Sequence, residues 1–447
     1  MGDLDAIFKA YDVRGLAEDQ IDEATSRSIG AAYAAFVRDT EGAQSIVVGH
    51  DMRPTGETYS NAFCDGAMSQ GVDVIHIGLV STDMMYYASG SLDLPGAVFT
   101  ASHNPAEYNG IKMCRRSAGP LGGETGLETI KAAAADRLTP VAIPGTRSEQ
   151  NMLGAFADHV LSFIDRETIR PLKVVADTAN GMGGLVVPAV FSQLPFELEI
   201  LYEELDGTFP NHPADPIQEE NLVDLKKRVL ETGADIGLAF DGDADRVFLV
   251  DASANGVSGS LTTALVAKQV LQQEPGASII HNLICSKVVP EVVVEMGGTP
   301  IRTRVGHSFI KDVMAETGAA FGGEHSGHYY FRDNFRADSG LIAAVVVLDA
   351  MCKENKSLED LVAPLRRYSA SGELNTRVAD TGAVIEKVSA AYSHLEQDRL
   401  DGLTIDGGDW WCNVRASNTE PLLRLNLEAA TQDDVDARVA EIRSHMS

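Results

Sequence analysis

The chain has 447 residues, 44% hydrophobic and 23% charged, which predicts a folded protein of several domains and excludes a largely disordered one. Its formal net charge is −29, from 65 acidic against 36 basic side chains. This charge argues against a nucleic-acid partner, because contact with a phosphate backbone needs clustered lysine and arginine, while a local basic pocket can still bind a small anion.

Membrane and secretory features are also missing. No stretch approaches the roughly 18 to 20 continuous apolar residues that span a bilayer. The first five residues are acidic and lack the basic start and apolar run of a signal peptide. The five cysteines are scattered and form no CxxC pair, so neither a zinc ribbon nor a disulfide framework is indicated. We expect a cytoplasmic protein without membrane contact.

Short apolar runs alternate with helical patterns along most of the chain. In chain order we expect a strand at 45–49, a helix at 59–69, and strands at 72–77, 96–100, 173–176, 236–240, 279–285 and 299–305. Strands that alternate with helices favour α/β units around mainly parallel sheets, and the length favours three such units in series.

The last segment differs in character. It has an expected strand at 373–378, a helix, strands at 411–414 and 422–427, and a final helix, which predicts a small α+β domain. Polar or Pro/Gly-marked breaks near 139–150, 251–260 and 366–372 separate the units.

One loop between two apolar runs places Asp241, Asp243 and Asp245 at alternate positions. Small residues between them let the oxygens converge, and three like charges gather unfavourably without a cation. A calcium-binding EF-hand is excluded, since Arg246 and Ala252 stand where it needs glycine and glutamate. We predict a hard-metal site here, with a solvated acidic turn as the alternative.

A second polar loop follows the expected strand at 96–100 and contains Ser102, His103 and Asn104. Active sites form at the carboxyl ends of strands in α/β sheets, so Ser102 is a candidate nucleophile, with His103 as a further catalytic candidate. The same residues also suit a plain turn, and the loop alone leaves both readings open. Lys112 is a candidate proton donor or phosphate partner.

A third loop packs two imidazoles, a carboxylate and a hydroxyl between glycines: Glu324, His325, Ser326 and His328. It predicts either a polar pocket for sugar hydroxyls or a tight turn with satisfied histidines. A fourth loop, 415–421, is followed by Arg424. Arginine, small hydroxyl side chains and turn N–H groups together suit an anion nest, and a hairpin turn is the alternative.

Taken together and in this order, the four loops resemble those of the α-D-phosphohexomutase superfamily, and within it the bacterial phosphomannomutase/phosphoglucomutase group. The resemblance runs from 8–15 (Phe-Lys-Ala-Tyr-Asp-Val-Arg-Gly) to 415–421 and covers the whole chain. It implies three related α/β domains with mixed, mainly parallel sheets plus a smaller C-terminal α+β domain. We place these domains at 1–145, 146–255, 256–368 and 369–447.

The resemblance also implies roles for single residues. Ser102 would be a phosphoserine that binds Mg²⁺ together with Asp241, Asp243 and Asp245. The residues that would line the catalytic centre are Tyr11, Arg14, Lys112, Arg246, His307 and His328. Glu324 and Ser326 would bind sugar hydroxyls. The distal phosphate would be held by Arg415, Ser417, Asn418, Thr419 and Arg424.

The implied reaction interconverts mannose 6-phosphate and mannose 1-phosphate, and also glucose phosphates, through a hexose 1,6-bisphosphate that serves as activator. One departure is visible, because Ile284 stands where the family usually carries a lysine and Lys287 is offset. Tyr11, His325 and Asn418 differ from the pattern of phosphoglucosamine mutases, so glucosamine 1-phosphate is expected to be a poor substrate. A metal-dependent phosphatase and a sugar-phosphate sensor are the competing hypotheses.

Overall fold

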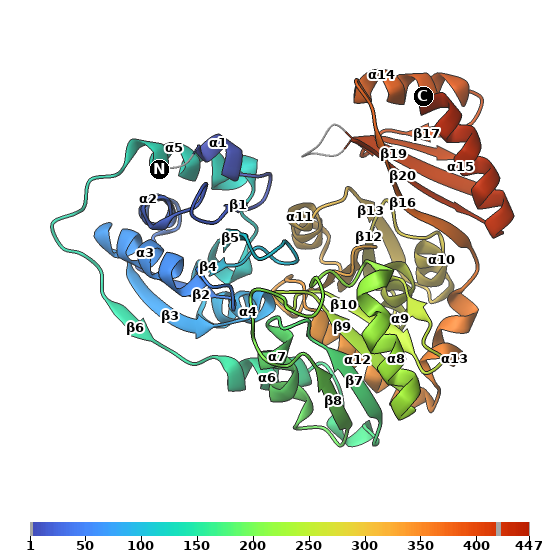
Figure 1. Cartoon of the computed structure of the whole chain (residues 1–447), viewed down its shortest axis with the longest axis horizontal. Coiled ribbons are helices and arrows are strands. Elements are labelled where there is room, and N and C mark those ends of the chain that lie inside the picture. The colour runs from blue at the N-terminus through green and yellow to red at the C-terminus, as the bar shows by residue number, and fades with distance from the viewer. Residues whose placement is uncertain (1–2, 417–421, 447) are drawn as a thin grey trace.

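The structure, a computed structural model, describes residues 3–416 and 422–446, except for the side chains of Glu124 and His307. The chain folds into four units in sequence order, with the N-terminal unit at one side and the C-terminal unit at the opposite upper corner (Figure 1). Each unit has its own sheet. The predicted fold class of three α/β units and a smaller antiparallel one is confirmed.

The first unit has a six-stranded sheet in the order β1-β5-β4-β2-β3-β6, in which β1 and β5 are antiparallel to their neighbours. Its strands are β1 (Val13–Leu16), β2 (Ser45–His50), β3 (Asp73–Leu79), β4 (Gly96–Phe99), β5 (Tyr108–Cys114) and β6 (Arg147–Glu149). Its helices are α1 (Leu4–Ile7), α2 (Glu23–Glu41), α3 (Gly56–Ser69), α4 (Thr82–Leu92) and α5 (Glu128–Asp136). Because β6 pairs with β3, this sheet reaches past residue 145.

The second unit has a five-stranded sheet in the order β11-β10-β9-β7-β8, parallel from β9 to β8. Its strands are β7 (Lys173–Asp177), β8 (Glu197–Leu201), β9 (Ile236–Phe240), β10 (Val247–Asp251) and β11 (Gly256–Val257). Its helices are α6 (Leu153–Leu161), α7 (Gly183–Phe191) and α8 (Val223–Thr232). The antiparallel pair β9–β10 is a hairpin, so the acidic loop predicted to bind metal is the turn of that hairpin.

The third unit has a four-stranded sheet in the order β13-β12-β14-β15. Its strands are β12 (Ser278–Asn282), β13 (Thr299–Thr303), β14 (Phe321–Gly323) and β15 (Tyr329–Phe331). Its helices are α9 (Gly259–Gln273), α10 (Val288–Glu295), α11 (His307–Thr317), α12 (Gly340–Glu354) and α13 (Leu358–Val362). The strand expected at 279–285 is too long, because the chain turns after Asn282, whose carbonyl accepts from the Cys285 N–H at 3.1 Å.

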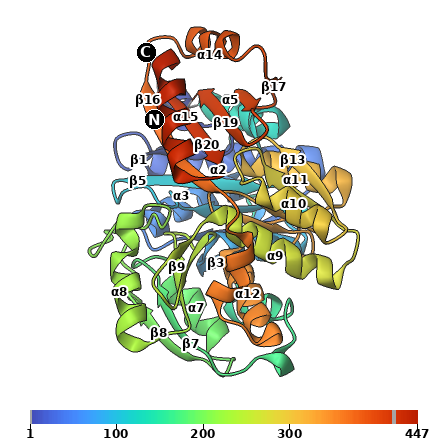
Figure 2. The same cartoon turned by 90° about the vertical axis from the view of Figure 1, so that its right-hand side faces the viewer.

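The fourth unit is an antiparallel sheet in the order β16-β20-β19-β18-β17. Its strands are β16 (Ser369–Arg377), β17 (Glu396–Asp398), β18 (Leu403–Asp406), β19 (Trp410–Ala416) and β20 (Leu422–Ala429), and its helices are α14 (Thr381–Ala391) and α15 (Gln432–Met446). Figure 2 shows α15 lying across one face of this sheet. Its buried Val435 and Ile442 pack in one cluster with Leu423 and Leu425 of the sheet.

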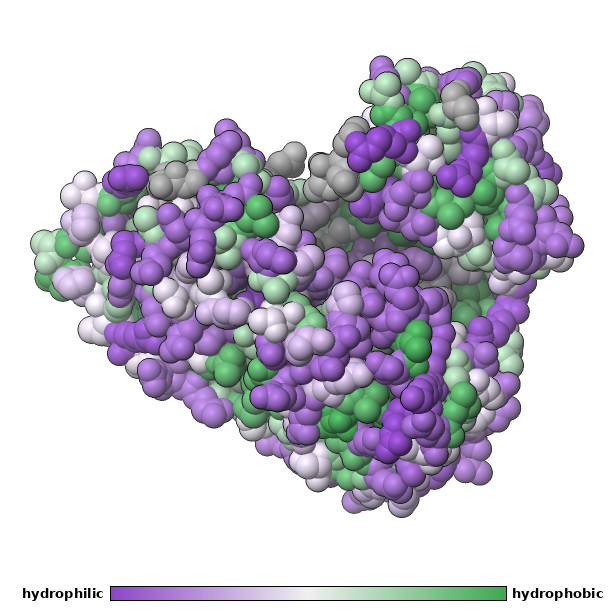
Figure 3. Space-filling model, in the orientation of Figure 1, coloured by the Kyte–Doolittle hydropathy of each residue, from purple (hydrophilic) through white to green (hydrophobic). Residues whose placement is uncertain are grey.

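One apolar core joins the second and third units and reaches one face of the first sheet, while the other face of that sheet and the fourth unit have cores of their own. The space-filling view shows a wide hollow between the N-terminal and C-terminal units, with polar residues on both sides (Figure 3). In the described part of the chain, no helix is long and apolar enough to cross a membrane.

Candidate active site

The loop that carries Ser102 leaves the carboxyl end of β4 and curls back toward β5. Ser102 has a positive φ of 49°, and its N–H donates to the Thr100 hydroxyl at 2.9 Å. This backbone turns the buried Ser102 Oγ toward the second unit, where it donates to Asp241 Oδ2 at 2.9 Å. His103 Nδ1 lies 3.2 Å from the same oxygen. The sequence alone could not tell whether Ser102 is a nucleophile or only part of a turn. The fold supplies the missing observation, because it points the Ser102 hydroxyl at the acidic hairpin.

Arg53 fixes the position of that loop, and the sequence reading missed it. It follows β2 at the same sheet edge, and its guanidinium donates four hydrogen bonds of 2.7 to 2.9 Å to the carbonyls of Ser102, Asn104, Pro105 and Tyr108. Its Nε lies 3.3 Å from Asp51 Oδ2, and both side chains are fully buried. The only available signal was an arginine just beyond a parallel strand, since its acceptors are backbone atoms without sequence identity.

The acidic hairpin presents Asp241, Asp243 and Asp245 with one oxygen of each within 4.8 Å of the others, all at most 1% exposed. Gly242 is required here, since a Cβ at this position would lie 2.4 Å from the Ser102 carbonyl oxygen. Asp243 Oδ1 and Asp245 Oδ1 are buried without a hydrogen-bond partner among the described residues. Buried, unpaired carboxylate oxygens that converge are the ligands a hard divalent cation prefers, so the donor set fits a metal ion.

Two cations balance part of this negative charge. Lys112 Nζ donates to Asp243 Oδ2 at 2.7 Å and to Asp245 Oδ2 at 2.6 Å, and Arg246 Nε donates to Asp241 Oδ2 at 2.8 Å. Burial alone would lower the pKa of Lys112, yet the two carboxylates raise that pKa well above its usual value. The ammonium therefore stays charged and adds positive charge to the acidic hairpin that Ser102 contacts through Asp241.

Arg246 also reaches the nucleophile loop. Its Nη2 lies 3.3 Å from Ser102 Oγ and 2.5 Å from His103 Nδ1. Burial, with the positive charges of Arg246 and Arg14, holds the pKa of His103 well below its ordinary value. His103 is therefore a neutral imidazole, which can accept a hydrogen bond from the guanidinium. Arg14 itself donates to Asn104 Oδ1 at 2.7 Å, at the tip of the same loop.

The loop between β14 and β15 brings the third unit to the same place. A β-bridge joins Arg246 to His328, whose Nε2 lies 3.8 Å from Asp245 Oδ1 and whose Nδ1 lies 3.0 Å from Ser326 Oγ. Glu324 is 2% exposed and accepts from Tyr330 Oη at 2.8 Å. The predicted role of His307 rests on a side chain outside the described ones.

A buried cluster beside His328 was not expected from the sequence. Asp338 joins Asp245 and His328 within 4.8 Å, and Lys311 Nζ lies 3.5 Å from Asp338 Oδ1 and over the ring of Tyr86 at 3.5 Å. These residues are far apart in sequence and carry no local motif, so only the packing of α11 and α12 against the first unit reveals them.

The fourth unit contributes the paired Arg415 and Arg424, which stand opposite each other on β19 and β20. Ser417, Asn418 and Thr419 lie outside the described residues. Tyr11 of the first unit connects this region to the third, because a Cβ at Gly306 would lie 2.8 Å from the Tyr11 hydroxyl. Burial raises the pKa of Tyr11. Among the nearby charges, Glu324 of the third unit raises this pKa further and Arg415 of the fourth unit lowers it.

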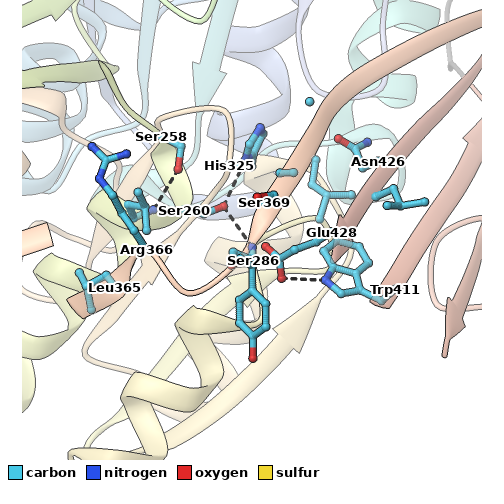
Figure 4. A pocket seen from close by; sticks show the side chains of 16 residues that line it. Ser258, Ser260, Ser286, His325, Leu365, Arg366, Ser369, Trp411, Asn426 and Glu428 are labelled. Atoms are coloured by element: carbon cyan, nitrogen blue, oxygen red, sulfur yellow. Dashed lines mark hydrogen bonds between the residues drawn. The ribbon is translucent and has the colours of Figure 1, made fainter. Parts of the chain in front are cut away.

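A separate hollow of about 350 Å³ lies where the third and fourth units meet, and Figure 4 shows its lining. His325 borders this hollow, and its Nδ1 is hydrogen-bonded to Ser260 Oγ at 3.1 Å. His325 therefore lies on the opposite side of the loop from His328. Ile284 also borders it, while Lys287 Nζ pairs with Asp406 of the fourth unit at 3.0 Å. Lys287 is thus engaged in holding two units together.

The fold and the geometry define a class: a four-unit α/β protein in which a buried serine, three carboxylates and several cations meet from different units. Matches to known proteins agree. Four family descriptions of phosphoglucomutase/phosphomannomutase match in order, alpha/beta/alpha domains I, II and III at residues 5–139, 154–256 and 258–368, and the C-terminal domain at 373–445.

Among relatives, phosphohexose mutases of Xanthomonas campestris pv. campestris (strain B100) are 39% identical over 98% of this chain and 97% of theirs. A phosphomannomutase of Escherichia coli (strain K12) is 38% identical over 98% and 97%. A phosphoglucomutase/phosphomannomutase family crystal structure from Burkholderia thailandensis superposes with a TM-score of 0.92 at 31% identity, over 100% of this chain and 98% of that one. The chain belongs to the phosphoglucomutase/phosphomannomutase family of the α-D-phosphohexomutase superfamily, and it is a mutase of the isomerase class.

Proposed function

We propose that the protein interconverts mannose 6-phosphate and mannose 1-phosphate, and also the glucose phosphates, through a phosphoserine at Ser102 and a hexose 1,6-bisphosphate. The observation that carries this proposal is the position of Ser102 Oγ. It lies 2.9 Å from a carboxylate of the acidic hairpin and 3.3 Å from Arg246.

Phosphoryl transfer needs a positioned oxygen and fixed positive charge more than it needs a strong base. Ser102 supplies the oxygen, Arg246 supplies buried positive charge beside it, and Lys112 supplies buried positive charge on Asp243 of the neighbouring acidic hairpin. A phosphoserine carries about −1.5 to −2 charges, which these cations would hold. The arginine pair of the fourth unit would hold the phosphate that does not react.

In the forward half of the reaction, the bond between Ser102 Oγ and phosphorus breaks and a bond from phosphorus to the free sugar hydroxyl forms. The hydroxyl proton leaves to a base, for which His307 and His328 are the candidates. The departing Ser102 oxygen takes up a proton and becomes a hydroxyl again, and Lys112 is the candidate donor. The bisphosphate then turns around, and Ser102 takes the other phosphoryl group. A free hexose 1,6-bisphosphate would act as activator by recharging Ser102.

Asp241, Asp243 and Asp245, together with Ser102, would hold Mg²⁺. The bound ion would supply positive charge for the transferred phosphoryl group, as oxygen-only ligand sets on phosphate enzymes do. Glu324 and Ser326 would bind the sugar hydroxyls. His103 would stay neutral and orient Arg246.

Two other functions remain to be separated by experiment. A phosphatase would pass the phosphoryl group to water and release inorganic phosphate, and a sensor would bind without turnover. Full-length relatives named as mutases favour transfer between sugar oxygens.

The test compares mannose 1-phosphate, glucose 1-phosphate and glucosamine 1-phosphate in a coupled assay, with Mg²⁺ and a trace of hexose 1,6-bisphosphate. We expect turnover of the first two without phosphate release and much poorer turnover of the third. Preference for glucosamine 1-phosphate would contradict the substrate assignment, and stoichiometric phosphate release would contradict the mutase reaction itself.

A further inference from the structure

One face of the C-terminal sheet is polar and the other is apolar, because side chains alternate along each strand. On β20, Leu423, Leu425 and Leu427 are buried in the core under α14 and α15. The residues between them, Arg424 and Asn426, therefore stand on the opposite face. Their register partners on β19 share that face, so Arg415 faces Arg424 directly across the ladder.

Two arginines placed side by side repel each other unless an anion lies between them. Glu373 of β16 is that anion in this structure. Its Oε2 accepts from Arg415 Nη2 at 2.9 Å, and its Oε1 lies 3.5 Å from Arg424 Nη1. The Nε atoms of both arginines are buried without a hydrogen-bond partner among the described residues, so the pair still has unused donors.

The backbone aims Glu373 at this pair through an irregularity in β16. The register between β16 and β20 shifts between Ala370 and Glu373, and Gly372 in this bulge has a φ of +65°. Bulges of this kind redirect the side chain that follows them. After the bulge, Glu373 stands directly opposite Asn426, two ladder positions from Arg424 and on the same face of the sheet.

Asn426 offers a second place for the same carboxylate. It is 5% exposed, and its Nδ2 is buried without a hydrogen-bond partner in the described part of the chain. It borders the hollow between the third and fourth units (Figure 4). Directly opposite residues of an antiparallel pair have Cβ atoms about 4.5 to 5.5 Å apart, which a glutamate side chain spans easily.

We propose that Glu373 is an internal counter-anion of the phosphate subsite. It neutralises Arg415 and Arg424 when no phosphate is present, and it moves to the Asn426 amide when a phosphate displaces it. This inference rests on the proposed function only in taking the arginine pair as the phosphate subsite. Glu373 is thus an affinity-determining residue, and it favours dianionic phosphates over singly charged anions, which carry no more charge than the carboxylate they must replace.

The direct test is calorimetric titration of the full-length protein with inorganic phosphate at low ionic strength. Glu373→Gln keeps the shape and removes the competing charge. Since Glu373 is 30% exposed, solvent screening limits the gain, and we expect phosphate affinity to rise about two- to tenfold. The variant Glu373→Gln/Arg415→Ala should lose this gain, which assigns it to the arginine pair. Unchanged or weaker binding by Glu373→Gln would overturn the proposal, because a purely structural ion pair would hold the arginines worse when broken.

The matched control is Glu386→Gln, which removes an exposed carboxylate of the same unit that pairs with Arg399 at 2.7 Å and should leave phosphate affinity unchanged.

Asn426→Ala should weaken phosphate binding in the wild-type background and have no effect in Glu373→Gln, since the Glu373→Gln variant has no displaced carboxylate that needs a donor. Equal effects of Asn426→Ala in both backgrounds would refute the second position. Circular dichroism of each variant checks its fold. Mutase turnover is measured separately, so a gain in phosphate affinity without turnover would count against the proposed function and leave this inference standing.

Discussion

Replacing Arg53 by methionine tests whether the nucleophile loop is held from behind. Methionine keeps an unbranched side chain in the buried space and removes all four hydrogen bonds to the carbonyls of the loop. It also leaves the fully buried Asp51 without its cation. Burial already raises the pKa of Asp51, against the opposing effect of Arg53.

The expected loss of stability follows from these contacts. Breaking one partner of a buried ion pair typically costs about 3 to 5 kcal/mol. At about 2 to 4 °C per kcal/mol, the thermal midpoint should fall by roughly 6 to 20 °C. Because a shift of about 1 Å at the reacting atom can cost on the order of 100-fold in rate, kcat should fall by about that factor at temperatures well below unfolding.

The assays are thermal unfolding by circular dichroism and the coupled mutase assay at 20 °C below the midpoint of the variant. Arg228→Met is the control, because Arg228 of α8 pairs with Glu199 of β8 and both side chains are more than a third exposed. This variant should leave both readouts nearly unchanged. If Arg53→Met shifts the midpoint no more than the control does, or retains full kcat, the loop does not depend on this guanidinium.

Four further outcomes are expected. Ser102→Ala should abolish mutase turnover, and mass spectrometry of the freshly purified wild type should find a phosphorylated fraction at Ser102; near-full activity of the variant would exclude the phosphoserine route. Chelation should abolish turnover and Mg²⁺ should restore it, with Asp243→Asn requiring far more Mg²⁺; turnover in excess chelator would exclude a metal role. Arg415→Lys keeps the charge and loses the bidentate guanidinium, so the transition-state stabilisation measured by kcat/KM should decrease by about 1.5 to 3 kcal/mol. No change would mean that Arg415 and Arg424 do not hold phosphate. Burial raises the pKa of Asp83 to about 7 from an ordinary 3.8, so the native state holds a proton that the unfolded state loses. The free energy of unfolding should therefore decrease as pH rises from about 4 to about 7, by up to about 4 kcal/mol. In urea unfolding, the plot of this free energy against pH should be flatter for Asp83→Asn than for the wild type, and parallel plots would refute this pKa.

Local chemistry made several parts of this protein predictable from sequence. The strand at 236–240 matches β9, and most other expected strands match within a few residues, because apolar runs bounded by turn residues specify strands locally. The acidic hairpin was predictable for the same reason, since Asp241, Asp243 and Asp245 are neighbours along the chain and their mutual repulsion needs an explanation wherever they lie.

Other features depend on residues that only the folded chain brings together. Arg53 acts on backbone carbonyls, Lys311 meets Asp338 in a buried network, and Glu373 reaches two arginines more than forty residues away in sequence. A sequence motif records spacing along one segment, whereas these contacts cross between strands and units. The domain limits and the roles of single site residues stay predictions.

By itself, the sequence determined the order of units, the acidic turn and the loops that carry charge, since each depends on residues adjacent in the chain. The tertiary structure alone decided which loops meet. Ser102 points at Asp241 because a positive-φ turn and Gly242 let two units approach within contact distance. Charge pairing inside a low-dielectric interior depends on distances of a few ångströms, and those distances are set by how the units pack.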